Sequence, residues 1–197
     1  MNTKHQCTWS TKTNLESNYH NCHWAVPITS DTLHFEFITL EAAQAGLSWY
    51  TILKKRDSYK EAFANFCIDT VSKFTQEDEQ RLLQDKGIIR HKQKIAASIN
   101  NAKCFLKIQE EQGSFNNYIW SFVNNKPINN QWENERDIPS STALSDKVSK
   151  DLKKRGFKFV GTTTIYAYLQ AAGIINDHTK KCFRYKEILK IQKELGF

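Results

Sequence analysis

Hydrophobic positions repeat at helical spacing in several separate segments of the chain. Leu33, Phe37 and Leu40 fall every three or four positions, which is the period of one face of an α-helix. A later segment repeats this spacing with Ile95, Ile99, Ala102 and Leu106. No run alternates between apolar and polar residues as a half-buried strand does. The pattern therefore predicts an all-α protein.

Cap and turn residues divide this pattern into helices. Ser30 or Asp31 is expected to cap the first of them and Thr75 a later one, because short polar side chains bond the free N–H groups of a first turn. Helices are expected to end at Gly87, Gly156 and Gly173, since glycine adopts positive φ cheaply. Further helices are predicted at residues 118–123, 143–155 and 163–172, and the longest loop at residues 124–139.

Length, composition and charge narrow the class of protein. The 197 residues, 40% of them hydrophobic, suit one globular domain and argue against disorder. The net charge is +7, and two stretches concentrate it: residues 86–107 hold six Lys or Arg and no acid, and residues 147–158 hold six against one Asp. Such stretches fit a surface that faces phosphates, or an ordinary solvated helix face.

The compartment is expected to be the cytoplasm. The first twenty residues contain no continuous apolar stretch, and no later run has the length of a membrane span. The five cysteines, at positions 7, 22, 67, 104 and 182, are then expected to be reduced and to act as ligands or core residues.

Two pairs of metal-binding residue types lie near the two ends of the chain. Cys7 and His20 come early, and His178 and Cys182 come late. Two thiolates and two imidazoles are a typical ligand set for structural zinc. The spacing alone also fits a buried cysteine and a hydrogen-bonded histidine at each end, and Cys22 or His23 could serve as another ligand.

Several ordered sequence blocks resemble one known family. They are Gln-Ala-Gly-Leu-Ser-Trp at residues 44–49, Gly-Ile-Ile-Arg-His at 87–91, Lys-Lys-Arg-Gly-Phe-Lys-Phe-Val-Gly-Thr-Thr at 153–163, and Asn-Asp-His at 176–178. Together they resemble the DNA-3-methyladenine glycosylase I family of the helix-hairpin-helix superfamily, from residue 7 to residue 182. The resemblance implies a compact two-lobed helical fold. We expect one glycosylase domain over residues 1–185, with the helix-hairpin-helix at about 78–108, and a C-terminal extension over 186–197.

The resemblance also implies a role for particular residues. One structural zinc ion would join the N- and C-terminal segments through Cys7, His20, His178 and Cys182. Glu41 would recognise the damaged base as the catalytic carboxylate, with Trp9, Tyr19 and Trp49 as the aromatic residues that bind it. The DNA-binding residues would be Gly46, Leu47, Arg90, Lys92 and Lys94.

The implied function is base-excision repair by a monofunctional glycosylase. Such an enzyme flips 3-methyladenine out of alkylated double-stranded DNA and releases it by hydrolysis, with no membrane association, and we expect a monomer. Asp177, beside an implied zinc ligand, is expected to support that site rather than act on the sugar. No lysine falls on a catalytic position of the family.

The chain departs from the family around the implied zinc ligand His20. Asn21, His23 and Ala25 stand where the family usually has Asp, Glu and Gly, and Glu16 replaces a common tyrosine. A zinc-stapled DNA-binding protein of the same fold with weak or lost excision is therefore the alternative. A helical scaffold without a DNA role is a third hypothesis, which would leave the basic stretches unexplained.

Overall fold

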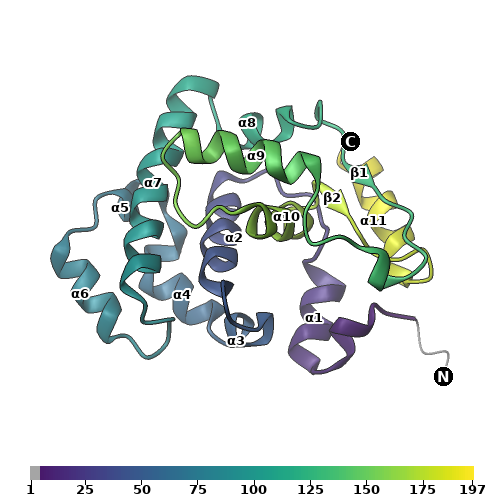
Figure 1. The fold of residues 1–197 in the computed structure, drawn as a ribbon, viewed down its shortest axis with the longest axis horizontal. Coiled ribbons are helices and arrows are strands. Elements are labelled where there is room, and N and C mark those ends of the chain that lie inside the picture. Colours follow the sequence, from purple (N-terminus) through teal and green to yellow (C-terminus); the bar gives the residue numbers. More distant parts are fainter. Residues whose placement is uncertain (1–4) are drawn as a thin grey trace.

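The central helix, α2 (Asp31–Gln44), is buried on all sides from His34 to Ala43. In the computed structural model, which describes residues 5–197, it packs against α3 (Trp49–Leu53), α7 (Lys92–Gln112), α8 (Phe115–Ser121) and α10 (Thr162–Ala171) (Figure 1). A helix in this position has no solvent-facing stripe. Its polar side chains must therefore find partners inside the protein or face a cavity.

The other elements surround this helix (Figure 1). In chain order they are η1 (Thr8–Thr11), α1 (Asn14–Cys22), α4 (Arg56–Ala62), η2 (Ala64–Phe66), α5 (Ile68–Ser72), α6 (Gln76–Gln84), β1 (Ile128–Asn129), η3 (Glu135–Asp137), α9 (Ala143–Lys154), β2 (Ile175–Asn176) and α11 (Phe183–Glu194). α9 packs on α10, and α5 and α6 pack on α7. The predicted helical class is confirmed, since helices make up most of the described chain.

Most of the predicted helices lie where the sequence pattern put them. Thr75 caps α6 in a capping box with Asp78. Gly156 and Gly173 follow α9 and α10 with φ of 92° and 69°, as expected for a helix end. Asp31 differs from its expected role: it begins α2, and its carboxylate accepts the backbone N–H groups at the start of α8, at 2.8 Å each.

The prediction for Gly87 was wrong. α6 ends at Gln84, and the φ of Gly87 lies outside the left-handed region. A Cβ at this position would lie 2.7 Å from the Cβ of Ser58 on α4, closer than two such atoms approach. Glycine is therefore needed for close packing of the turn against α4, and not for its φ.

The long loop contributes one strand, β1, to the one strand pair in the described residues. β1 pairs in parallel with β2, joining Ile128 to Ile175 and Asn129 to Asn176. The sequence pattern gave no sign of these two-residue strands. Their consequence is that the loop over residues 124–139 is fixed beside the segment that leads to His178.

The C-terminal helix α11 spans the expected boundary between residues 185 and 186 and packs on this same region. The ring of Phe197 stacks on Trp120 with centroids 4.4 Å apart. Asn129 donates a hydrogen bond to Gln192 at 2.8 Å. Among the described residues, no helix combines the length and apolar character that crossing a bilayer requires.

Candidate functional site

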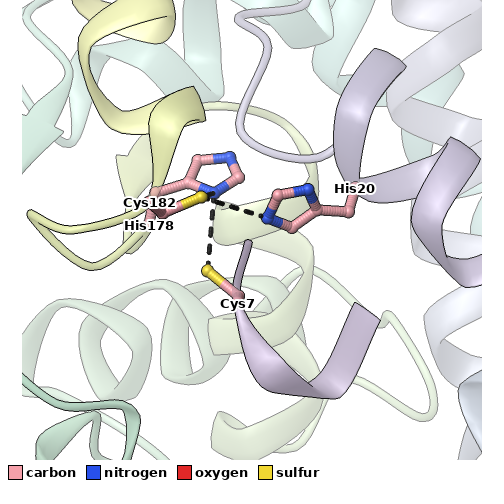
Figure 2. A group of neighbouring side chains, drawn as sticks. All are labelled: Cys7, His20, His178 and Cys182. Atoms are coloured by element: carbon pink, nitrogen blue, oxygen red, sulfur yellow. Dashed lines mark hydrogen bonds between the residues drawn. The ribbon is translucent and has the colours of Figure 1, made fainter. Parts of the chain in front are cut away.

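The structure brings together the four cysteine and histidine residues from the two chain ends. Cys7 precedes η1, His20 lies on α1, and His178 and Cys182 flank the turn before α11 (Figure 2). All four are buried, and their Sγ and ring nitrogen atoms lie within 4.8 Å of one another. Of the described residues, only these four form such a group. Cys22 and His23, the other candidates for ligands, are exposed and lie outside it.

The dimensions of this cluster match a tetrahedral metal site. Sγ of Cys182 lies 3.4 Å from Nε2 of His20 and 3.5 Å from Nδ1 of His178, and Sγ of Cys7 lies 3.7 Å from the same nitrogen. Zinc–sulfur bonds of about 2.3 Å and zinc–nitrogen bonds of about 2.0 Å at tetrahedral angles give sulfur–nitrogen edges of about 3.6 Å. The side chains thus need no rearrangement to hold one small cation.

The second nitrogen of each histidine ring also has a partner. Nδ1 of His20 lies 2.7 Å from Oδ1 of Asn21, and Nε2 of His178 lies 3.4 Å from the backbone oxygen of Trp24. Such partners orient the ring and select the tautomer of a ligating histidine. Asn21 does so as a neutral amide.

The two thiols of the cluster shift each other's pKa in opposite directions. A hydrogen bond between them raises the pKa of Cys7 and lowers that of Cys182. Burial raises the pKa of Cys7 further. The lowered pKa of Cys182 favours its thiolate, which is the form of cysteine that binds metals.

A pocket with a volume of about 540 Å³ opens next to this cluster. Its walls come from η1, α1, α2, α3, α10 and the loop that contains η3. The four residues expected to bind the base all line it: Trp9, Tyr19, Glu41 and Trp49. The structure thus brings together side chains spread over the first quarter of the sequence.

Glu41 is the unpaired carboxylate of the pocket. Two other buried polar residues of α2 have partners: His34 contacts the hydroxyl of Tyr168 at 2.7 Å, and Glu36 accepts from Arg56 at 2.6 Å. Within residues 5–197, Glu41 has no hydrogen bond or ion pair, and burial raises its pKa to about 8. Burying a carboxylate without a hydrogen-bond partner costs free energy. Glu41 is therefore available to pair with a group of a bound ligand.

Aromatic rings surround the space in front of Glu41. The ring of Tyr19 lies 5.2 Å from that of Trp49 and 6.3 Å from that of Trp9, measured between centroids. Trp9 also meets the edge of Trp24 at 5.1 Å. Burial raises the pKa of the Tyr19 hydroxyl well above its usual value, so it remains a neutral donor. Such rings attract a cation through their faces.

Sequence reasoning missed part of the pocket wall. Tyr166 and Gln170 of α10 line it, as does the loop through Ile138. Glu16, noted only as a departure from the family, is a second buried carboxylate in the wall. Tyr166 and Gln170 are four apart on a helix, which places them on one face, but nothing in the sequence says that this face meets a cavity.

Asp177 links the long loop to α10 beside the cysteine–histidine cluster. Its fully buried carboxylate accepts hydrogen bonds from Asn130 and Trp132 in the long loop, and from Tyr166 and Gln170 on α10. The expected role of Asp177 is to support the neighbouring site, and its hydrogen bonds fix the two segments on either side of it. Asp177 thus ties the pocket-lining residues Tyr166 and Gln170 to the long loop, while its neighbour His178 belongs to the cluster.

The residues expected to contact DNA fall into two groups. Gly46, with φ of 79°, and Leu47 form an exposed turn between α2 and α3. Arg90 and Lys92 are exposed near the turn between α6 and α7. Lys94 differs from the expectation, because it is buried and its ammonium group donates to backbone oxygens at the end of α2.

Comparisons with known proteins agree with this arrangement. The Methyladenine glycosylase family model matches residues 9–185. The chain is 47% identical to DNA-3-methyladenine glycosylase 1 of Escherichia coli (strain K12), covering 91% of this chain and 96% of that protein. It is 43% identical to DNA-3-methyladenine glycosylase of Haemophilus influenzae (strain ATCC 51907 / DSM 11121 / KW20 / Rd), covering 90% and 96%.

Solved structures give the same result. A crystal structure of 3-methyladenine DNA glycosylase I superposes with a TM-score of 0.88 at 46% identity, covering 91% of this chain and 98% of that one. The Staphylococcus aureus enzyme superposes with a TM-score of 0.88 at 39% identity, covering 91% and 96%. A variant of such an enzyme in complex with 3-methyladenine has the same TM-score and identity, covering 90% and 96%. The chain therefore belongs to the methyladenine glycosylase family.

Proposed function

We propose that this glycosylase excises 3-methyladenine from alkylated double-stranded DNA by hydrolysis, as a monofunctional and monomeric enzyme. The observation that carries the proposal is the unpaired, buried Glu41 in a pocket walled by aromatic rings. The family relatives are named for 3-methyladenine, and one related structure is described as a complex with that base.

The chemistry of the pocket suits a cationic purine. Adenine methylated at N3 in DNA carries a positive charge. The faces of Trp9, Tyr19 and Trp49 would attract this charge by up to about 2 kcal/mol. Glu41 would accept a hydrogen bond from the exocyclic amine and, once ionised, balance the charge. Normal adenine is neutral, so it would gain neither the ion pair nor the full cation–π attraction.

The reaction needs little help at the sugar. When the bond between the sugar C1′ and N9 breaks, its electron pair goes to the base, which leaves as a neutral molecule. Water then adds to C1′ and loses a proton. The lysine that lines the pocket, Lys12, is exposed, and no covalent amine step is part of the proposal.

The base must leave the duplex before it can enter the pocket, at a cost of a few kcal/mol. We assign the filling of the resulting gap to the Gly46–Leu47 turn, where Leu47 is exposed and can insert between bases. α6, the turn that follows it and α7 would form the helix-hairpin-helix. Its backbone amides, with Arg90 and Lys92, would hold phosphates without reading sequence.

We assign one structural zinc ion to Cys7, His20, His178 and Cys182. When bound, the metal supplies a closed four-ligand link between the two ends of the chain and leaves no open position for water. Cys7 lies two positions before Trp9, and His20 directly follows Tyr19. The four ligands therefore hold the aromatic wall of the pocket against α10 and the segment before α11.

The deciding experiment is release of free 3-methyladenine from methylated duplex DNA by the purified protein. Glu41→Gln is expected to lower the single-turnover rate about 10- to 100-fold, because it removes a charge-assisted hydrogen bond to the base. The control Glu110→Gln, at an exposed position of α7, should match the wild type. Wild-type protein that binds methylated DNA but releases no base at stoichiometric concentration would instead be a DNA-binding member of the family.

A further inference from the structure

Lys94 makes a buried connection between the two segments assigned to DNA binding. It lies in the first turn of α7, and its side chain crosses to the end of α2. Its Nζ donates to the backbone oxygen of Ala43 at 2.8 Å and to that of Ala45 at 2.6 Å. Only 8% of the residue is exposed. Two of its three donors are therefore used inside the protein.

The two oxygens that it binds stand at a helix end. α2 ends at Gln44, and Ala45 leaves the helical region before Gly46 turns with positive φ. The last carbonyl groups of a helix have no partner within the helix, and they form its negative pole. The ammonium group of Lys94 donates hydrogen bonds to these carbonyl groups and places a positive charge at the negative pole of the helix. Both oxygens belong to residues that come just before the chain turns at Gly46 toward Leu47.

Lys94 is itself held in place. Its backbone N–H donates to Nδ1 of His91, the residue that caps α7, at 3.3 Å. Its side chain forms no ion pair with a carboxylate in the part of the chain that the structure describes. Burial lowers the pKa of Lys94. A charge that is kept in such a place without a counterion indicates that its position matters to the protein.

We infer that Lys94 is a positioning residue that fixes the Gly46–Leu47 turn to the start of α7, so that the turn can fill the gap left by a flipped nucleotide. This inference rests on the proposed function. It differs from a phosphate contact, in which the ammonium group would face the DNA, as that of the exposed Lys92 can. The two residues are two positions apart on one helix, and they provide a matched pair.

The first test compares the salt dependence of binding to undamaged duplex DNA. Lys92→Met is expected to reduce the slope of log Kd against log salt by about 0.9, the value for one phosphate contact. Lys94→Met is expected to change the slope by less than half as much. A slope change by Lys94→Met that equals the change by Lys92→Met would show a phosphate contact and overturn the inference.

The second test uses duplex DNA with an abasic site, where the turn has a gap to fill. Lys94→Met is expected to weaken binding to this DNA about 10-fold relative to undamaged DNA, whereas Lys92→Met should weaken both equally. In a Leu47→Ala background, Lys94→Met should have less than a 3-fold further effect, because residues that act as one unit are not additive. Full additivity would refute the coupling.

Two controls keep the outcome clear. Binding of free 3-methyladenine to Lys94→Met should stay within about 3-fold of wild type, which shows an intact pocket. If the Met variant does not fold, the same cycle is measured with Lys94→Arg, which keeps a charged donor. Wild-type protein that shows no preference for abasic over undamaged DNA would contradict the proposed gap filling itself, and not only the part of Lys94 in it.

Discussion

Replacing Glu41 by glutamine removes an ionisable group that the fold holds at an unusual pKa. Burial raises the pKa of Glu41 from 4.5 to about 8. In the pH range between these values, the folded state keeps the proton while the unfolded state releases it. The folded state therefore binds more protons, and the contribution of Glu41 to stability falls as pH rises. The contribution is fully present below pH 4.5 and is lost as pH rises through 8.

The size of the effect follows from the shift. One pKa unit corresponds to about 1.4 kcal/mol. Between pH 4.5 and pH 7 the ionisation of Glu41 should cost the wild type about 3 kcal/mol, and above pH 8 about 5 kcal/mol in all. Glutamine has nearly the same shape and carries no charge at any pH. Glu41→Gln should therefore gain about 3 kcal/mol over the wild type from pH 4.5 to pH 7, while it loses activity.

The assay is urea unfolding of both proteins at several pH values from 4.5 to 8.5. The measured quantity is the difference between their unfolding free energies, in which the titration of all other groups cancels. Glu36→Gln is the matched control, because Glu36 is buried on the same helix but paired with Arg56 at 2.6 Å. That variant should be destabilised by about 1–3 kcal/mol. A Glu41→Gln difference that stays constant with pH would refute the raised pKa.

Four further outcomes are expected. The kcat/KM for methylated DNA should fall as pH decreases below about 8, where Glu41 becomes protonated, and Glu41→Gln should abolish this slope; a wild-type profile that is flat from pH 6 to 8 would contradict it. Metal analysis should find one zinc per chain, and Cys182→Ser should bind it at least about 100-fold more weakly. The control Cys22→Ser, at an exposed cysteine, should keep the zinc. Full stability of the protein without metal would exclude the structural role. Borohydride should trap no covalent complex between the protein and DNA, since no amine step is proposed. A complex that forms with the wild type but not with Lys12→Met would contradict the proposed hydrolysis. Asp177→Asn should cost about 1–3 kcal/mol of stability and raise KM more than it lowers kcat; equal KM in both proteins would mean that its four hydrogen bonds do not order the pocket.

The helices could be predicted because their signals are local. Thr75 begins α6, and Gly156 and Gly173 end α9 and α10, through contacts within a few residues. The features that the sequence pattern did not predict correctly depend on packing between distant segments. Gly87 is required by Ser58 on another helix, and β1 and β2 are too short to show a pattern of their own.

The candidate site shows the same division. His178 and Cys182 have a local spacing, but only the fold brings Cys7 and His20 to them. The family resemblance supplied that pairing in advance, and the geometry agrees with it. It could not supply the hydrogen bonds of Asp177 or the direction of the Lys94 side chain. Both depend on contacts between segments that lie tens of residues apart.

Because the two chain ends meet in one cluster, the cluster can form only late in the synthesis of the chain. Cys7 and His178 are 171 positions apart, and a ribosome delivers the N-terminal partner first. Before the late pair is made, the segment with Trp9 and Tyr19 can contact α3 but lacks His178 and Cys182, whereas α2 can already pack against α7 and α8. The pocket in front of Glu41 is thus complete only after α10 has been made. A nascent chain can be helical and still lack a wall of this pocket.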